Sequence, residues 1–435
     1  MPSIPIHCCS GRSDNVRRVN TFRLKRGAAL LGGVAALATG CSSPRRLEVA
    51  DTLTTSQPSV AGMDAHLRVT LDSIANEAIG RGVASGISIA VGRYGRLVHL
   101  RGYGTTDWAP GSAAVNDSTL FDIASLTKVV ATSMAAMLLE EEGLLDLDRP
   151  VRSYVPELKA RDKATITSRM LLTHSAGFEA GAPLYRKWKG RAAYLRQIDL
   201  RPLKYKPGTS SIYSDWDMVV LQAVIERIAK EPLDSLVARR VFGPLGMRDT
   251  RFTPDLRDSA LLARIVVTEN DSTRGGPLRG VVGDHNAWAL GGVAGQAGLF
   301  SSARDLAVFA QVLLDGGVYR GRPLLRPETI ARWTARQNLM SSRALGWDAP
   351  APGASSGQYF SPRSFGHTGY TGTSMWIDPE RSLFVVLLMN RVNSRGISEG
   401  HLSIRRAVSD AVQEAILDAP LVTWEKRLTK TADPP

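Results

Sequence analysis

The stretch GTSMWIDPERSLFVVLLMN, residues 372–390, decides the fold. Two runs rich in β-branched, aromatic and other apolar residues flank Pro379-Glu380, so the stretch predicts a β-hairpin. A second hairpin is expected far earlier in the chain, at 86–104, where GISIAVGR and RLVHLRGYG flank Tyr94-Gly95. Strand signals therefore lie near both ends of the chain.

Helical patterns fill the space between the two hairpins, mainly from Ser125 to about Pro254. An amphipathic helix is expected from Met63 to Ile79, and a closing helix from about Ile404 to Leu417. Strands at both ends with helices between them do not alternate as a βαβ fold requires. The pattern predicts an α+β fold, with an antiparallel sheet assembled from both termini, flanking helices and an inserted, mainly helical lobe.

We expect one catalytic domain over residues 63–420, followed by a C-terminal tail at 421–435. Its α/β part is expected at about 63–120 and 290–420, and its helical lobe at about 125–285. No internal repeat divides this region.

The N-terminal segment has the features of a targeting signal over residues 1–40. The basic residues from Arg23 to Arg26 precede AALLGGVAALA at 28–38, an apolar run too short to span a bilayer. The following Leu37-Ala38-Thr39-Gly40-Cys41 resembles a bacterial lipobox, which implies lipidation of Cys41. We expect an exported, membrane-anchored lipoprotein facing the periplasm or the cell exterior, with a flexible tether at 41–62. The alternative is an ordinary signal peptide, with Cys41 as a bystander.

Composition excludes several classes of protein. The net charge is +13, but the basic residues of the body are scattered, without the interleaved aromatic residues of single-strand binders, so no nucleic-acid partner is expected. All three cysteines lie in the first 41 residues, so the body has neither a disulfide framework nor a cysteine-based zinc site. The seven histidines show no paired spacing, and we expect no metal and no cofactor.

The motif that indicates a catalytic function is Ser125-Leu126-Thr127-Lys128. Residues i and i+3 share one face of a helix, so the lysine amine can reach the serine hydroxyl. A serine needs an adjacent base to act as a nucleophile, and burial near other cations would lower the pKa of Lys128 towards that role. A lone Ser-x-x-Lys is a weak signal, because a capping serine with an exposed lysine gives the same pattern.

Two further motifs strengthen this interpretation: Tyr213-Ser214-Asp215, and His367-Thr368-Gly369. Their order after Ser-x-x-Lys resembles the signature of the serine β-lactamase and penicillin-binding-protein family, in the group of class C β-lactamases, D-alanyl peptidases and family VIII esterases. The flanking sequences LFDIASLTK, MLLTHSAGF and GHTGYTGTSMWIDPE are also similar, and the resemblance covers roughly residues 64–418.

The resemblance implies roles for individual residues. Ser125 would become acylated, with Lys128 and Tyr213 sharing proton transfer, and the backbone N–H groups of Ser125 and Tyr370 would form the oxyanion hole. Substrate binding would fall to four residues of the second and third motifs, namely Asp215, His367, Thr368 and Gly369.

Two of these positions depart from the usual family pattern. Asp215 stands where Asn is usual, so a carboxylate replaces an amide donor. His367 stands where Lys is common, so a group that is often neutral replaces a fixed charge. Both changes weaken the recognition of an anionic β-lactam.

We therefore expect a serine hydrolase that forms an acyl-enzyme on a small ester or on a D-amino-acid peptide or amide, including cell-wall peptides. A true β-lactamase or D,D-carboxypeptidase is the alternative within the family. The alternative of a different class is a catalytically weak, lipid-anchored protein that binds or senses the cell wall. We expect structural and not catalytic roles for two further polar sites. His174 is interpreted as part of a loop, and Asp284-His285-Asn286 as a capping turn.

Overall fold

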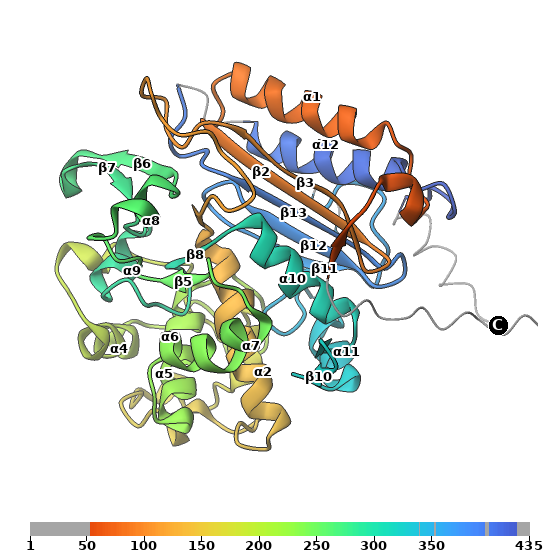
Figure 1. The fold of residues 1–435 in the computed structure, drawn as a ribbon. Coiled ribbons are helices and arrows are strands. Elements are labelled where there is room, and N and C mark those ends of the chain that lie inside the picture. The colour runs from red at the N-terminus through yellow and green to blue at the C-terminus, as the bar shows by residue number, and fades with distance from the viewer. Residues whose placement is uncertain (1–52, 339, 352–353, 396–399, 424–435) are drawn as a thin grey trace, which may run out of the picture. The chain divides into compact units, whose positions relative to one another are not determined.

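The two predicted hairpins lie side by side in one sheet, although most of the chain separates them (Figure 1). This computed structural model describes residues 53–338, 340–351, 354–395 and 400–423. The first hairpin consists of β2 (Gly86–Arg93) and β3 (Arg96–Gly104), and the second of β12 (Ser374–Asp378) and β13 (Leu383–Met389). The predicted signal peptide and Cys41 lie outside the described residues.

The sheet has six strands in the order β1-β3-β2-β13-β12-β11, where β1 is Thr54–Thr55 and β11 is Phe365–Thr368. All neighbours are antiparallel except β1 and β3. The two hairpins join along β2 and β13, where Val91 lies opposite Val385. The predicted α+β fold, with a sheet built from both ends of the chain, is confirmed.

Both faces of the sheet are buried, which explains the continuous apolar run of β13. Val385 and Leu387 pack in a core with α1 (Leu67–Gly80) and α12 (His401–Glu414). The alternate residues Phe384 and Val386 belong to the larger core on the opposite face. On that face α10 (Ala303–Leu314) lies against β2 and β13, between the sheet and the helical lobe (Figure 1).

The segment between the hairpins is mainly helical, as the pattern predicts, and also contains three small sheets. One has the strand order β4-β8-β5, and the others are the two-stranded pairs β6–β7 and β9–β10, which the sequence pattern did not predict. The lobe and the segment leading to β11 comprise β4 (Phe121–Asp122), α2 (Met134–Glu141), α3 (Ser168–Leu172), α4 (Arg191–Leu200), α5 (Asp215–Ala229), α6 (Leu233–Val237), α7 (Gly243–Leu245), β5 (Arg251–Phe252), α8 (Ser259–Ala263), β6 (Val267–Asp271), β7 (Gly276–Arg279), α9 (His285–Ala289), β8 (Leu299–Ser301), β9 (Val318–Tyr319), β10 (Arg322–Pro323) and α11 (Pro327–Thr334).

The packed domain begins earlier than Met63. Strand β1 pairs in parallel with Arg96 and Leu97, and a 3₁₀ turn follows at Pro58–Ala61 with Pro58 and Ala61 buried. The C-terminal part of the expected tether, from Thr54 to Gly62, is therefore part of the fold, because the edge of β3 offers it backbone hydrogen bonds. Among the described residues, no helix combines the length and the apolar character that crossing a bilayer requires.

Candidate active site

Ser125 lies in a tight turn at the junction of the sheet and the lobe. Strand β4 leads into a 3₁₀ turn at Ala124–Leu126, and a π-helical segment at Lys128–Ser133 continues into α2. Residues three apart are eclipsed in a 3₁₀ turn, which directs Lys128 towards Ser125. The Lys128 ammonium Nζ donates to Ser125 Oγ at 2.9 Å, so the contact that the spacing predicts is present.

The residue before the nucleophile has a strained backbone. Ala124 has φ +47°, in the left-handed region that residues with a Cβ rarely adopt. The Asp122 carboxylate holds this turn by accepting from the N–H of Ala124 at 2.9 Å and from that of Gly283 at 2.7 Å. From the other side, the Thr371 hydroxyl donates to the Asp122 carbonyl at 2.7 Å. The fold therefore fixes the direction of the Ser125 side chain.

Lys128 is fully buried, and its amine contacts three acceptors. Besides Ser125 Oγ, it donates to Asp215 Oδ1 at 2.8 Å and to the Gln296 carbonyl at 2.9 Å. Burial alone would lower the pKa of Lys128, but the Asp215 carboxylate and the Tyr213 phenol together raise it above its usual 10.5. The expectation of a lowered pKa is therefore wrong, because Asp215 supplies a counter-ion that the local motif does not reveal.

Tyr213 lies where several groups of the site converge. Its ring centroid is 4.9 Å from Lys128 Nζ and 5.0 Å from the guanidinium carbon of Arg343. The His174 ring lies 4.6 Å away and the His367 ring 5.9 Å away, measured between centroids. The three sequence motifs therefore meet at one place, with Tyr213 between two cations and two imidazoles.

His174 and Asp217 form a buried pair beneath Tyr213. His174 Nδ1 lies 2.7 Å from Asp217 Oδ2 and also accepts from the Ser214 N–H at 3.3 Å. Burial and the charge of Asp215 raise the pKa of Asp217 well above 3.8, whereas burial and the cations Arg343 and Lys128 lower the pKa of His174. Both shifts favour the uncharged forms, and this hydrogen-bonded pair supports the Tyr213 ring.

His367 is buried on β11 and is neutral. Its Nδ1 donates to the Thr368 carbonyl at 2.8 Å, and its Nε2 has no partner among the described residues. Burial first, and then Arg343 and Lys128, keep its pKa well below 6.5. His367 therefore offers the site a neutral acceptor, and it does not supply the positive charge that a Lys at this position would carry.

Gly369 must be a glycine, because it packs against the nucleophile turn. An added Cβ would lie 2.4 Å from the Ile123 carbonyl and 2.1 Å from Thr373 Oγ1. This close approach places the next residue, Tyr370, on the wall of the pocket that Ser125 also lines. The oxyanion hole formed by the N–H groups of Ser125 and Tyr370 stays a prediction that this arrangement permits.

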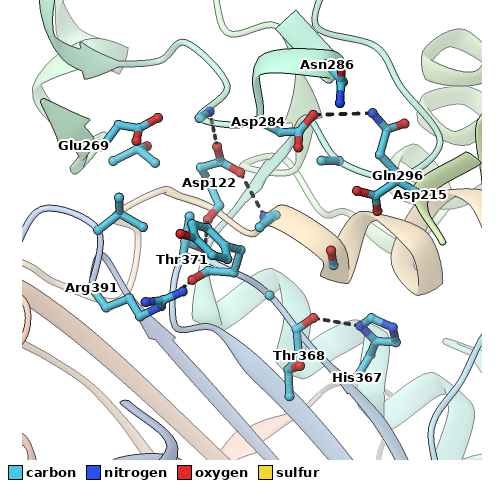
Figure 2. A pocket seen from close by; sticks show the side chains of 18 of the residues that line it. Asp122, Asp215, Glu269, Asp284, Asn286, Gln296, His367, Thr368, Thr371 and Arg391 are labelled. Atoms are coloured by element: carbon cyan, nitrogen blue, oxygen red, sulfur yellow. Dashed lines mark hydrogen bonds between the residues drawn. The ribbon is translucent and has the colours of Figure 1, made fainter. Parts of the chain in front are cut away.

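The motifs line a pocket of about 690 Å³, shown with Asp215, His367 and Thr368 in Figure 2. Ser125 also lines this pocket and is partly exposed. Arg343, which sequence reasoning missed, also lines it and pairs with Asp348 at 3.5 Å. Arg343 lies in a loop outside the three motifs, and its place beside Tyr213 depends on tertiary structure. Within the described residues, no three His, Cys, Asp or Glu side chains are grouped to hold a metal ion.

Asp284 and Asn286 act as structural groups, as we expected. Asp284 caps α9 by accepting from the Ala287 N–H at 2.6 Å, and Asn286 Oδ1 accepts from the Tyr194 hydroxyl at 2.9 Å. Asp284 nevertheless also lines the pocket.

The chain is similar to known proteins over most of its length. The Beta-lactamase family model matches residues 71–407. The chain is 33% identical over 378 residues to the "Putative D-alanyl-D-alanine carboxypeptidase" of Salmonella agona (strain SL483), covering 79% of this chain and 87% of that protein.

Two solved structures show the same fold. EstCE1, a hydrolase with promiscuous acyltransferase activity, aligns with TM-score 0.64 and 23% identity over 80% of this chain and 98% of its own. A penicillin-binding-protein homologue from Caulobacter crescentus aligns with TM-score 0.63 and 19% identity over 80% and 99%. The family match, together with the relative's identity and coverage, establishes that this chain belongs to the β-lactamase family of serine hydrolases.

Proposed function

We propose that the chain is a peptidase that removes the last residue from short peptides ending in a free carboxylate, through an acyl-enzyme on Ser125. The observation that carries the proposal is the 2.9 Å contact between Lys128 Nζ and Ser125 Oγ, in a pocket lined by all three motifs. The name of the Salmonella relative, a D-alanyl-D-alanine carboxypeptidase, supports a substrate of this type.

Acylation begins when Ser125 Oγ attacks the carbonyl carbon of the peptide bond. The serine proton passes to Tyr213 Oη, and the phenol's own proton passes to the leaving amine as the C–N bond breaks. Lys128, held as an ammonium by Asp215, donates to Oγ and stabilises its developing negative charge. The N–H groups of Ser125 and Tyr370 are proposed to bind the carbonyl oxygen.

Deacylation follows the same route in reverse, with water in place of the amine. The water oxygen attacks the acyl carbon, and one of its protons passes to Tyr213 Oη. The phenol proton then returns to Ser125 Oγ as the ester bond breaks. The products are the shortened peptide and a regenerated serine.

Arg343 supports the choice of a substrate with a carboxylate. His367 is neutral, so it supplies no charge where the family often has Lys. Arg343 lines the pocket and lies 5.0 Å from the Tyr213 ring centroid, and an arginine fork matches a carboxylate well. Small esters are the second candidate, favoured by the absence of a charge on His367 itself.

Mass spectrometry after incubation with a fluorophosphonate and with penicillin tests the nucleophile. We expect an adduct on the peptide that contains Ser125, and none there in Ser125→Ala. Ser118→Ala is the matched control, because Ser118 does not line the pocket, and this variant should keep the adduct. A protein that binds penicillin reversibly and forms no adduct would instead be the binding or sensing protein of the alternative hypothesis.

Turnover of a peptide acid and of the corresponding peptide amide tests the substrate class. The proposal expects Arg343→Gln to lower kcat/KM about tenfold or more for the acid and much less for the amide. Equal losses for both substrates would show that Arg343 does not recognise the carboxylate.

We also propose that the protein is exported and anchored through a lipid on Cys41. The lipobox-like sequence before Cys41 supports this proposal. Metabolic labelling with a fatty acid should mark the wild-type chain and leave Cys41→Ser unlabelled. Labelling that persists in the variant would contradict the anchor.

A further inference from the structure

One end of the pocket carries an excess of negative charge. Asp122, Glu269 and Asp284 lie together on the side away from His367 and Thr368 (Figure 2). A Cβ on Gly283 would lie 3.4 Å from Asp122 Oδ2 and 3.3 Å from Glu269 Oε1, so these two carboxylates converge. We call Asp122, Glu269 and Asp284 the acidic end of the pocket.

The carboxylates of the acidic end are only partly neutralised by basic side chains in the described part of the chain. Arg274 pairs with Glu269 at 2.8 Å. In the described part of the chain, no lysine, arginine or histidine forms an ion pair with Asp122 or Asp284. Their hydrogen-bond donors are backbone N–H groups and the Gln296 amide, which lies 3.5 Å from Asp284.

Two buried side chains at this end have oxygen atoms without a partner. Thr268 and Gln296 are 2% and 1% exposed, and both line the pocket. Neither Thr268 Oγ1 nor Gln296 Oε1 has a hydrogen-bond partner among the described residues. Buried polar atoms normally have a hydrogen-bond partner. Two oxygens without a partner, next to the carboxylates of Asp122 and Asp284 that form no ion pair, therefore indicate a missing hydrogen-bond donor.

The carboxylates of the acidic end are destabilised without such a donor. Burial, opposed in part by the N–H groups of Gly283 and Ala124, raises the pKa of Asp122 to about 6, and Asp284 and Glu269 contribute to the rise. Burial and the charge of Asp215 also raise the pKa of Asp284. A positively charged group bound here would relieve this repulsion.

The acidic end is within reach of the reacting atoms. The Lys128 ammonium donates hydrogen bonds to both Ser125 Oγ and the Gln296 carbonyl. The side-chain amide of Gln296 in turn contacts the Asp284 carboxylate. His367 and Thr368 line the pocket away from the acidic end (Figure 2), and Arg343, another lining residue, contacts the Tyr213 ring that lies next to His367. A substrate with its carboxylate near Arg343 therefore places its acyl part towards Asp284.

We propose that the acidic end binds a primary ammonium group on the acyl part of the substrate. The preferred substrate is then a short zwitterionic peptide, with a free amino group on one side of the scissile bond and a free carboxylate on the other. This inference rests on the proposed peptidase function, which it narrows to a class of peptide.

The test compares two substrates that differ only at the ammonium. D-Alanyl-D-alanine carries an ammonium group where isobutyryl-D-alanine carries a methyl group of similar size. We expect kcat/KM for the dipeptide to exceed that for the isobutyryl compound about tenfold or more. Asp284→Asn should bring this ratio towards one, because asparagine still caps α9 but lacks the charge. Glu269→Gln is a second variant for the same measurement.

Equilibrium binding to Ser125→Ala separates the two proposals. A preference of that variant for the dipeptide, lost on adding Asp284→Asn, supports the ammonium site even if neither compound is hydrolysed by the wild type. Absence of hydrolysis would then overturn the peptidase function alone. A ratio near one in the wild type, or a ratio that neither variant changes, would overturn the ammonium site.

Discussion

Asp215 Oδ1 accepts a 2.8 Å hydrogen bond from the buried Lys128 ammonium, so the residue in place of the usual Asn is the counter-ion of this lysine. The exchange of an amide for a carboxylate therefore acts on the protonation of Lys128 as well as on substrate contacts. Sequence comparison alone suggests only the second effect.

The first prediction concerns Asp215→Asn. The variant removes the charge that keeps the pKa of Lys128 high, and burial then lowers that pKa. The amide also restores a donor for the substrate. We expect turnover of a chromogenic cephalosporin to rise about threefold or more relative to that of a short-chain ester. An unchanged ratio in the purified, folded variant would count against this account of Asp215.

The second prediction concerns the support beneath Tyr213. Asp217 Oδ2 shares a 2.7 Å hydrogen bond with His174 Nδ1, and an asparagine amide can keep this hydrogen bond whereas a leucine cannot. We expect Asp217→Asn to keep most of the activity, and Asp217→Leu to lower kcat about tenfold with little change in KM, because Tyr213 loses its position. Steady-state kinetics of both variants provide the measurement. Equal losses in both would contradict the claim that a hydrogen bond to His174 is what holds Tyr213 in position.

The third prediction concerns Gly369→Ala. The new Cβ overlaps the Ile123 carbonyl and Thr373 Oγ1, so the strand carrying His367 must move away from the nucleophile turn. We expect kcat/KM to fall about a hundredfold or more. Gly80→Ala is the matched control, because its Cβ meets no atom within 4 Å at the end of α1. Activity that survives in Gly369→Ala would show that the turn adapts.

The fourth prediction concerns stability at acidic pH. His99 lies on β3, where burial, opposed in part by the Asp72 carboxylate, lowers its pKa from 6.5 to about 4, and its Nε2 lies 2.9 Å from the Tyr103 hydroxyl. Between pH 4 and pH 6.5, His99 therefore binds a proton in the unfolded chain but not in the folded chain. The free energy of unfolding therefore falls as the pH drops from 6.5 towards 4, by up to about 1.4 kcal/mol per pH unit from this residue.

Urea unfolding of the wild type and of His99→Gln between pH 5 and 6.5 measures this contribution. The variant should lose less stability on acidification. Asp122 and Asp305, whose pKa values burial raises to about 6, act in the opposite direction but are present in both proteins. Parallel pH profiles for the two proteins would mean that His99 does not contribute.

The fold could be predicted to the extent that local patterns specify it. The strands at 86–104 and 374–389 carry long apolar runs around clear turns, and the structure pairs them. Strand β1 was missed because Thr54-Thr55 lies in a Ser- and Thr-rich stretch without periodicity, and it forms only because the edge of β3 is available. Strands β6 and β7 were missed for a similar reason, since β6 is largely polar and β7 contains a glycine and a proline.

The candidate site, like the fold, could be predicted only where the local sequence specifies it. The contact between Ser125 and Lys128 follows from a spacing of three residues, so the sequence predicts it. The charge of Lys128 depends on Asp215, which is distant in the chain, and local reasoning gave the wrong direction for its pKa. Arg343 and Glu269 reach the pocket from a loop and a short hairpin, and no motif in the sequence marks them.

The central position of β13 determines when catalysis can begin during synthesis. This strand lies between β2, made early, and β12, which connects to the His367 strand. A ribosome therefore produces the nucleophile long before the segment that completes the wall around it. A premature stop codon anywhere upstream of Met389 removes part of this strand and should give an inert product, so activity is among the last properties that the nascent polypeptide acquires.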